Sequence, residues 1–174
     1  VTMIVPLRHE LEWYVEQGFG DPLNLEPKWT DPLIINAAIT GMVPRKSDTP
    51  HVPVTPTEII DDAARCFQAG ASIVHLHARD EDQNPTHATD VYKQIVPVIR
   101  AQCPGIVICV TTSGRRVNTL EARSQVLFMK GAAKPDLASL TMGSMNFPQQ
   151  ASVNSPEMIT SLAGFMVQQG IVPE

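Results

Sequence analysis

The sequence predicts an α/β fold on a parallel sheet, and two patterns support this prediction. The apolar segments expected to be strands show almost no alternation of polar and apolar residues, which is typical of strands buried on both faces. Each is followed by a segment with helical periodicity before the next strand begins, which is the βαβ unit of a parallel sheet. Four such units and the beginning of a fifth strand make about half of a TIM (β/α)8 barrel, which typically needs about 250 residues.

An open, doubly wound sheet is the competing architecture. However, the strand-to-helix turns nearest the N-terminus carry no GxGxxG motif. The loops that follow the strands expected at 33–39, 106–112 and 137–143 are long and rich in Thr, Ser, Asn and Pro, whereas the loops entering the strands are short. Long loops at the carboxyl ends of strands are typical of the catalytic face of a barrel. We therefore expect the first half of a barrel, from its first strand to the start of its fifth.

The first two strands flank a well-marked helix. The first expected strand is LIINAAI at 33–39, and a proline-rich loop separates it from the helix. Thr55 or Thr57 is a suitable N-cap for that helix, acidic residues fill its first turns, and Gly70 ends its periodicity. The segment ASIVHLHA at 71–78 then has the apolar content of a second strand.

The alternation of helix and strand continues to the end of the sequence. Ser155 is the expected N-cap of the last helix, Pro156 lies in its first turn, and Gly170 is its expected C-cap. The final IVPE begins a fifth strand. The elements between are a helix at 89–102, a strand at 106–112, a helix at 120–130, a strand at 137–143 and the helix at 155–170.

Residues 1–30 differ from the rest of the chain. They are predicted to form an N-terminal extension of unknown role, and residues 31–174 to form the half-barrel. The extension contains Trp13, Tyr14, Phe19 and Trp29, and its pattern predicts a short helix around 10–17.

Composition and charge exclude several classes of function. The 174 residues are 43% hydrophobic and 18% charged, which is enough apolar material for one globular core. A formal net charge of -5 with scattered basic residues argues against a nucleic-acid or membrane partner, and no apolar run is long enough to span a bilayer. The three cysteines are widely spaced without a CxxC motif. We therefore expect a reducing, cytoplasmic setting and small buried thiols, not a thiolate metal site.

Two histidines interrupt the expected strand at 71–78. Side chains two residues apart on a strand point the same way, so His75 and His77 share a face near the carboxyl end, at the mouth of a barrel. Buried imidazoles cost about 1–3 kcal/mol per unsatisfied group, and neighbouring imidazoles suppress each other's protonation. One divalent cation bound by both neutral rings removes both problems, and zinc is the best match. A pair of hydrogen-bonded structural histidines is the alternative that the spacing leaves open.

Polar side chains follow the strands expected at 106–112 and 137–143. Hydroxyls at these ends, without a further histidine, suggest a site for a small oxyanion or carbonyl substrate. The sequence has no GxSxG motif, which argues against an activated serine. Helix capping by Ser and Thr in the loops between strand and helix is the alternative role for any one of these residues. The candidate substrate-binding residues are Thr111, Thr112, Ser113, Ser139 and Thr141.

The remaining histidines and the charged pair after the HxH motif suggest structural roles. His51 and His87 lie in polar loops, where we expect solvated side chains. Arg79 and Asp80 are expected to form a local ion pair or a cap.

Six motifs run in order from about residue 33 to the C-terminus. They are AAITG (37–41), DTPHVPVTPTEI (48–59), AGASIVHLHARD (69–80), ICVTTSGR (108–115), KPDLASLTMGSMNF (134–147) and SVNSPEMI (152–159). Together they resemble the β-keto acid cleavage enzymes, the DUF849 family, which includes the 3-keto-5-aminohexanoate cleavage enzymes. The resemblance implies a TIM barrel whose zinc is held by the HxH pair, here His75 and His77, with a carboxylate from a late strand.

The resemblance also implies a reaction. In this retro-Claisen reaction a β-keto acid and acetyl-CoA give acetoacetate and a new CoA thioester. Zinc would polarise the keto oxygen as a Lewis acid. Hydroxyls equivalent to Thr111 and Ser139 would hold the carboxylate or the keto group of the substrate.

Two departures from the family pattern affect these expectations. Val43 stands where members carry a Glu two residues after the Thr-Gly of the first strand, so we expect a substrate tail other than an amino-substituted one. The carboxylate that completes the zinc site, and an Arg and an Asp at the substrate, are expected beyond Glu174, so the catalytic residues stay unassigned. We therefore expect poor activity of the chain alone, and the unpaired strand edges of a half-barrel favour a homo-oligomer.

Two other functions remain open from the sequence. Amidohydrolase-type zinc hydrolases also place HxH on a barrel, but on the first strand, whereas this pair lies on the second. A half-barrel without catalytic activity that only mediates association is the alternative from another class. Zinc content and the mass in solution distinguish a zinc enzyme from the association module, because a metal-free dimer favours the module.

Overall fold

The computed structural model describes residues 33–148 and 151–174. The helix expected around 10–17, and the rest of the predicted extension, lie outside the described residues. Ile34–Glu174 form one unit of the structure.

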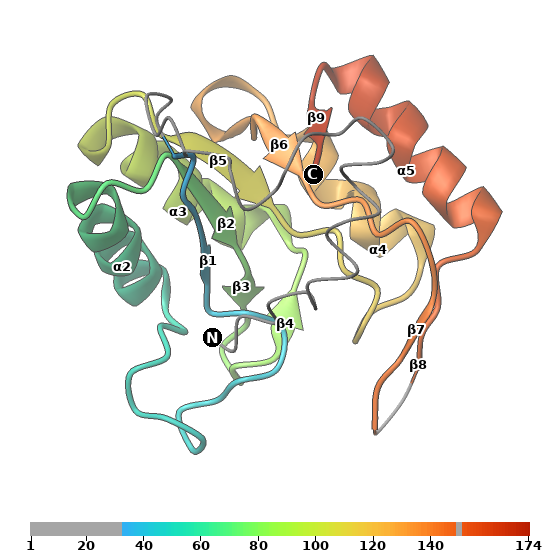
Figure 1. Ribbon diagram of the computed structural model, residues 1–174, viewed down its shortest axis with the longest axis horizontal. Coiled ribbons are helices and arrows are strands. Elements are labelled where there is room, and N and C mark those ends of the chain that lie inside the picture. The colour runs from blue at the N-terminus through green and yellow to red at the C-terminus, as the bar shows by residue number, and fades with distance from the viewer. Residues whose placement is uncertain (1–32, 149–150) are drawn as a thin grey trace, which may run out of the picture. The chain divides into compact units, whose positions relative to one another are not determined.

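Five parallel strands form the central sheet of this unit (Figure 1). They are β1 (Asn36–Ile39), β2 (Ile73–Leu76), β5 (Val107–Val110), β6 (Leu137–Ala138) and β9 (Val172–Pro173). Each strand lies beside its predecessor, in the order β1-β2-β5-β6-β9, and every neighbouring pair is parallel. The parallel sheet predicted from the sequence is confirmed. Its strand order shows no reversal of the kind that marks a doubly wound sheet.

Three long helices connect the strands, and local capping sets the ends of two of them. α2 (Pro56–Gln68) begins after Thr55, whose hydroxyl accepts a hydrogen bond from the Glu58 N–H while the Glu58 carboxylate accepts one from the Thr55 N–H. α5 (Pro156–Gln169) begins after Ser155 and ends at Gly170, which has a φ of 60°. These expected caps are confirmed, and α3 spans Thr89–Gln102 as predicted. No helix in the described part of the chain has the length and apolar character needed to cross a bilayer.

The helix expected at 120–130 is shorter than predicted. α4 (Leu120–Ser124) gives way to 3-10 turns at Gln125–Phe128 and Gly131–Ala133. Val126 and Leu127 are fully buried there, so the apolar pattern marked burial correctly. The pattern does not distinguish α-helical from 3-10 hydrogen bonding, and the prediction of one continuous helix is wrong for this reason.

Two short antiparallel hairpins lie beyond the carboxyl ends of the strands, and the sequence did not predict them. β3 (Ala78–Arg79) pairs with β4 (Pro85–Thr86) after β2, and β7 (Met145–Asn146) pairs with β8 (Ala151–Ser152) after β6. Strands of two residues carry too little periodic pattern to be detected. Both hairpins contribute side chains to the pockets described below.

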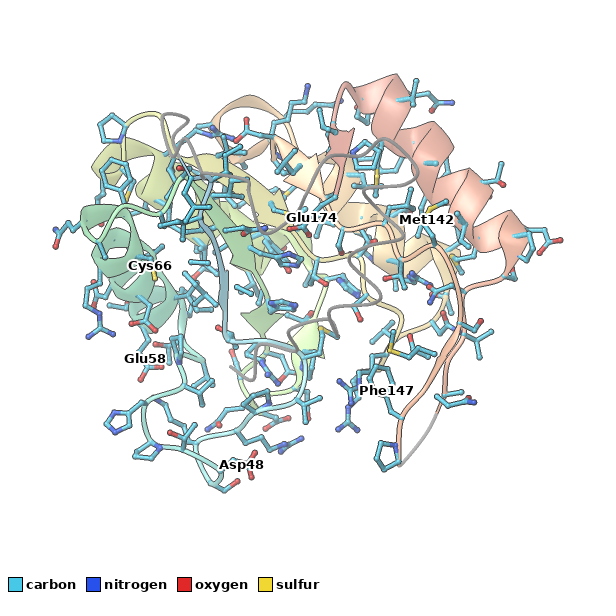
Figure 2. All side chains as sticks on the ribbon, viewed as in Figure 1. Asp48, Glu58, Cys66, Met142, Phe147 and Glu174 are labelled. Carbon is cyan, nitrogen blue, oxygen red and sulfur yellow. The ribbon has the colours of Figure 1, made fainter. Side chains whose placement is uncertain are left out.

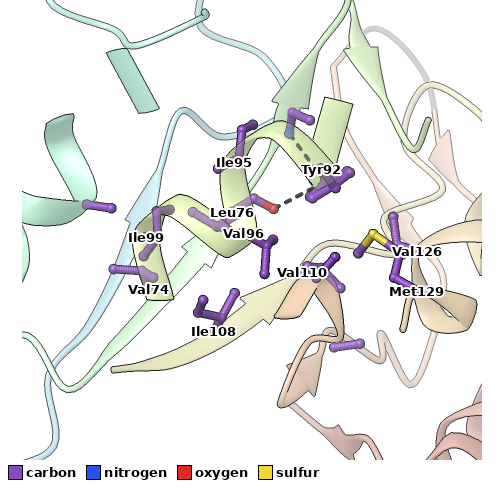
Figure 3. Close-up of a cluster of buried hydrophobic side chains, with 14 of the residues drawn as sticks. Val74, Leu76, Tyr92, Ile95, Val96, Ile99, Ile108, Val110, Val126 and Met129 are labelled. Atoms are coloured by element: carbon purple, nitrogen blue, oxygen red, sulfur yellow. Dashed lines mark hydrogen bonds between the residues drawn. The ribbon is translucent and has the colours of Figure 1, made fainter. Parts of the chain in front are cut away.

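Alternate residues of the central strands pack beneath the helices. Figure 3 shows this for the part of the core under α3, with Val74, Leu76, Ile108 and Val110. The residues between them, including His75 and Cys109, project to the opposite face of the sheet. The candidate polar site therefore lies on the face that the core helices do not cover.

Candidate active site

His75 and His77 lie side by side at the carboxyl end of β2. Their rings are stacked, with centroids 4.7 Å apart and an interplanar angle of 12°. Strand pairing sets this position, because His75 lies opposite Ala38 of β1 and Cys109 of β5. The spacing argument placed the rings on one face, and the structure agrees. Their role in metal binding stays a prediction.

A backbone carbonyl orients the ring of His77. Its Nδ1 lies 3.1 Å from the carbonyl oxygen of Ile39. Because a carbonyl only accepts hydrogen bonds, Nδ1 carries the proton and Nε2 presents a lone pair. Burial, and next the neighbouring His75, lower the pKa of His77 to about 4, so the ring is neutral near pH 7.

A carboxylate orients the ring of His75 in a similar way. Its Nδ1 lies 2.7 Å from Oε2 of Glu174, and the side chain of Asn36 donates to the other carboxylate oxygen. Burial lowers the pKa of His75, and the nearby Glu174 opposes this shift only in part. Nε2 of His75 is buried and has no hydrogen-bond partner among the described residues. A buried nitrogen lone pair of this kind is suited to a metal ion.

A second group of possible ligands lies beside His75. One ligand atom each of His75, Cys109 and Glu174 lies within 4.8 Å of the others. The Cys109 thiol donates to Glu174 over 3.3 Å, and burial together with this carboxylate raises the pKa of the thiol. In this group Nδ1 of His75 and Oε2 of Glu174 are in direct contact at 2.7 Å, and the Cys109 thiol is bonded to the same carboxylate. Because both Nδ1 atoms are held by hydrogen bonds, the ring nitrogens left for a cation are Nε2 of His75 and Nε2 of His77.

Glu174 and Cys109 are residues of this site that sequence reasoning missed. It expected the carboxylate of the metal site beyond Glu174, and it treated Cys109 as a small core residue. The pairing of β6 with β9 puts Leu137 opposite Val172, and Glu174 lies two residues further on the same face. An acidic residue at the end of an apolar strand was the signal available in the sequence.

A pocket of about 300 Å³ opens beside His77. Arg115 and Phe147 form part of its wall, with the guanidinium carbon 3.7 Å from the ring centroid. Figure 2 labels Phe147, which follows β7, and Glu174, which follows β9. The other lining residues are Met42, Ser113, Thr141, Met145 and Ser152. Two of the candidate hydroxyl residues, Ser113 and Thr141, therefore line the same pocket as His77.

The other three candidate hydroxyl residues form hydrogen bonds within the protein. Thr112 donates from its hydroxyl to the Ser139 carbonyl over 2.5 Å, and from its N–H to Ser139 Oγ over 2.9 Å. Thr111 is buried and accepts a hydrogen bond from the Ser113 N–H over 3.1 Å. The two contacts between Thr112 and Ser139 join the ends of β5 and β6. A role in substrate binding for these three residues stays a prediction.

A buried arginine fixes the loop after β5. Arg123 donates from Nε to the Thr112 carbonyl over 2.7 Å. Its two terminal nitrogens donate to the amide oxygens of Asn118, over 3.1 Å, and Asn154, over 2.7 Å. Gly114 passes so close that a Cβ there would lie 2.6 Å from Arg123 Nη1. A side chain at this position of the ICVTTSGR motif would therefore displace the Arg123 guanidinium.

Two other residues near the site are more buried than the sequence suggested. His87 is buried, with Nε2 3.0 Å from the Ser113 carbonyl, so the prediction of a solvated side chain is wrong. Arg79 is also buried, and it donates to three backbone carbonyls. Tertiary packing at the carboxyl ends of the strands produces this burial, which a polar local sequence does not reveal. His51 is exposed, as expected.

Comparisons with known proteins add to this geometry. A family model described as beta-keto acid cleavage enzyme matches residues 32–174. The chain is 39% identical to 3-oxoadipate:acetyl-CoA acetyltransferase of Cupriavidus necator, over 83% of this chain and 49% of that protein. It is 38% identical to 3-keto-5-aminohexanoate cleavage enzyme of Acetoanaerobium sticklandii, over 82% of this chain and 51% of that protein. The chain thus spans about half the length of the curated relatives it matches.

Solved structures share the fold. The apo structure of ObcA, a TIM-barrel enzyme, matches with a TM-score of 0.64 and 25% identity, over 72% of this chain and 30% of that chain. A type I 3-dehydroquinate dehydratase from Clostridium difficile matches with a TM-score of 0.53 and 14% identity, over 80% of this chain and 48% of that chain. The second match shows likeness of fold alone.

Proposed function

Because the chain belongs to the β-keto acid cleavage enzyme family, we propose that it takes part in acyl exchange between a β-keto acid and acetyl-CoA. In this retro-Claisen exchange the carboxymethyl unit of the β-keto acid passes to the acetyl group and gives acetoacetate. Coenzyme A takes up the remaining acyl group as a new thioester. The name of one of the curated relatives, 3-oxoadipate:acetyl-CoA acetyltransferase, supports acetyl-CoA as the second substrate.

The observation that carries this proposal is the pair of stacked imidazoles. Both rings are neutral near pH 7. In each ring Nδ1 is hydrogen-bonded to an acceptor, so Nε2 keeps its lone pair. His75 and His77 are suited to hold one divalent cation, for which zinc is the best match to two nitrogen ligands. When bound, such a cation supplies Lewis-acid stabilisation of an oxygen that gains negative charge.

The residues around the histidines have separate roles in this proposal. Glu174 and the Ile39 carbonyl keep each imidazole in the tautomer that frees Nε2. Ser113 and Thr141 line the pocket beside His77 and offer hydroxyls to the carboxylate or keto group of the substrate. Thr111, Thr112 and Ser139 support the substrate site by fixing the strand ends that carry it.

The five strands correspond in this proposal to the first five of a (β/α)8 barrel. Glu174 of the β9 end contacts Asn36 of β1, although these strands are at opposite edges of the sheet. In a flat sheet four strand spacings separate them, about 19 Å, which two side chains do not bridge. The contact therefore favours a sheet that curls toward closure, as barrel strands do.

Zinc binding tests the proposal without depending on turnover. Equilibrium dialysis followed by elemental analysis should find zinc on the unaltered chain and little on His75→Ala or His77→Ala. His51→Ala is the matched control, because it removes an exposed histidine from a loop. Equal zinc content in all four proteins would sink the proposed site. A metal-free protein that self-associates in light scattering would favour the association module instead.

A further inference from the structure

A second pocket, of about 290 Å³, adjoins the pocket beside His77, and the two share Met42. Three arginines line it, and we call it the arginine pocket: Arg45, Arg79 and Arg116. Its other lining residues are Val43, Asp80, Asn84, Pro85 and Val117. All of these residues follow β1, β2 or β5 in the chain. The arginine pocket therefore lies at the same end of the sheet as the two histidines.

In the part of the chain that the structure describes, the buried member of the arginine pocket has only neutral hydrogen-bond partners. Arg79 is 3% exposed, and its Nη2 donates to the carbonyls of Gly41 and Pro44 over 2.7 and 3.0 Å. Its Nε is buried and has no hydrogen-bond partner within the described residues. A guanidinium in this setting is stabilised by an added anion.

Among the described residues, one carboxylate lines the arginine pocket, and it is already engaged. Asp80 accepts hydrogen bonds from the N–H groups of Asn84, over 2.7 Å, and Asp82, over 3.0 Å, in the turn of the β3–β4 hairpin. Arg45 donates to the neutral side chain of Asn84 over 2.9 Å. Arg116 is exposed at the rim, where its long side chain is able to reorient toward a ligand. Of the described residues that line the pocket, three are positively charged and one is negatively charged.

We infer that the arginine pocket binds a carboxylate at the tail of the β-keto acid, so that the preferred substrates are dicarboxylic. This inference rests on the proposed function. Arg79 follows His77 by two residues, a Cα separation of about 7 Å in extended chain, so a short diacid is able to reach both pockets. The exposed guanidinium of Arg116 is able to bind a carboxylate in a bidentate manner, and the buried charge of Arg79 adds to the attraction. Val43 in the pocket wall offers no charge to an amino-substituted tail.

A phosphate of CoA shares this anion chemistry but fits the position less well. In an acyl-CoA the pantetheine arm separates the phosphates from the thioester. The arginine pocket, by contrast, shares the wall residue Met42 with the pocket beside His77. The distance available therefore favours the tail of the acid over the phosphates.

Titration calorimetry of the purified chain with adipate, hexanoate and the adenosine bisphosphate moiety of CoA separates these ligands. Adipate and hexanoate have the same chain length and differ by one carboxylate. We expect adipate to bind at least about tenfold more tightly, because a hydrogen bond to a charged group contributes that much. Arg116→Gln should remove most of this preference. Arg65→Gln removes the same charge from an exposed position of α2 and should leave the preference unchanged.

Several outcomes would overturn the inference. Equal affinity for adipate and hexanoate in the unaltered chain is one, and an adipate preference that survives Arg116→Gln is another. If Arg116→Gln weakens binding of the adenosine bisphosphate and leaves adipate unchanged, the pocket serves phosphate and the inference is wrong. None of these measurements involves zinc or acyl exchange. Failure of the zinc experiment would remove the proposed function and leave the anion site, whereas loss of the adipate preference would leave the proposed function intact.

Discussion

Replacing Glu174 perturbs the orientation of His75 without removing a histidine. Glu174→Ala deletes the acceptor that lies 2.7 Å from Nδ1 of His75 and determines which ring nitrogen carries the proton. Without this acceptor the two neutral tautomers become closer in energy, and the ring is less restricted. Zinc held through Nε2 should then bind more weakly.

The expected loss of zinc affinity is about 10–100-fold, the usual effect of removing an outer hydrogen-bond partner of a metal-binding histidine, or about 1.4–2.7 kcal/mol. The upper part of this range is expected, because the contact involves a carboxylate and a His75 side chain that is only 13% exposed. Glu174→Gln keeps an acceptor oxygen without the charge. Its loss of affinity should therefore be smaller than that of Glu174→Ala.

Competition with a chromogenic chelator measures the zinc affinity, and circular dichroism checks that each variant is folded. Glu121→Gln, which removes an exposed carboxylate from α4, is the control. Unchanged zinc affinity in folded Glu174→Ala would refute the reasoning. A cation at the alternative group of ligands gives a different pattern, in which Cys109→Ala lowers zinc affinity and His77→Ala does not.

Three further substitutions, two near the site and one in the first turn of α2, are each tested by the free energy of unfolding in urea. Gly114→Ala puts a Cβ 2.6 Å from Arg123 Nη1, and the forced shift should cost about 1–3 kcal/mol. Tyr92→Phe removes the hydroxyl that is hydrogen-bonded to the Ala78 N–H and the Leu76 carbonyl at the end of β2. Leaving these buried groups unpaired should lower the free energy of unfolding by about 1–3 kcal/mol. The pKa of Glu58 is lowered from 4.5 to about 2, chiefly by the hydrogen bond with Lys46. The ionised carboxylate therefore stabilises the fold fully above pH 4.5, and this contribution is lost as the pH falls toward 2. Glu58→Gln should therefore cost about 1 kcal/mol or less at pH 7, given the exposure of this side chain, and the difference should shrink at pH 3. Unfolding curves that match the unaltered chain would contradict each expectation in turn.

Features that depend on neighbouring residues were predictable from the sequence. Thr55 caps α2 through a residue three positions away, and Gly170 ends α5 in the left-handed conformation that favours glycine. The stacking of His75 with His77 follows from the period of two in an extended chain. In each case a short local pattern admits few alternative structures.

Features that depend on contacts between distant segments were not predictable in this way. His87 looked like a solvated loop residue, yet it is buried against the Ser113 carbonyl from the loop after β5. The apolar spacing after Leu120 is satisfied equally by α-helical and 3-10 turns, so it did not show where α4 ends. Glu174 was read only as the end of an apolar strand, because nothing local indicates which strand its carboxylate will face.

The curvature of the sheet connects the fold to the candidate site. β2 and β9 are separated by β5 and β6, so a flat sheet would hold His75 and Glu174 about 14 Å apart. Their side chains are nevertheless 2.7 Å apart, and Asn36 from the far edge of the sheet reaches the same carboxylate. Only a sheet that curls around its inner face brings these three residues together. The orientation of His75, and with it the direction of its open Nε2, therefore depends on the same curvature that distinguishes a barrel from an open sheet.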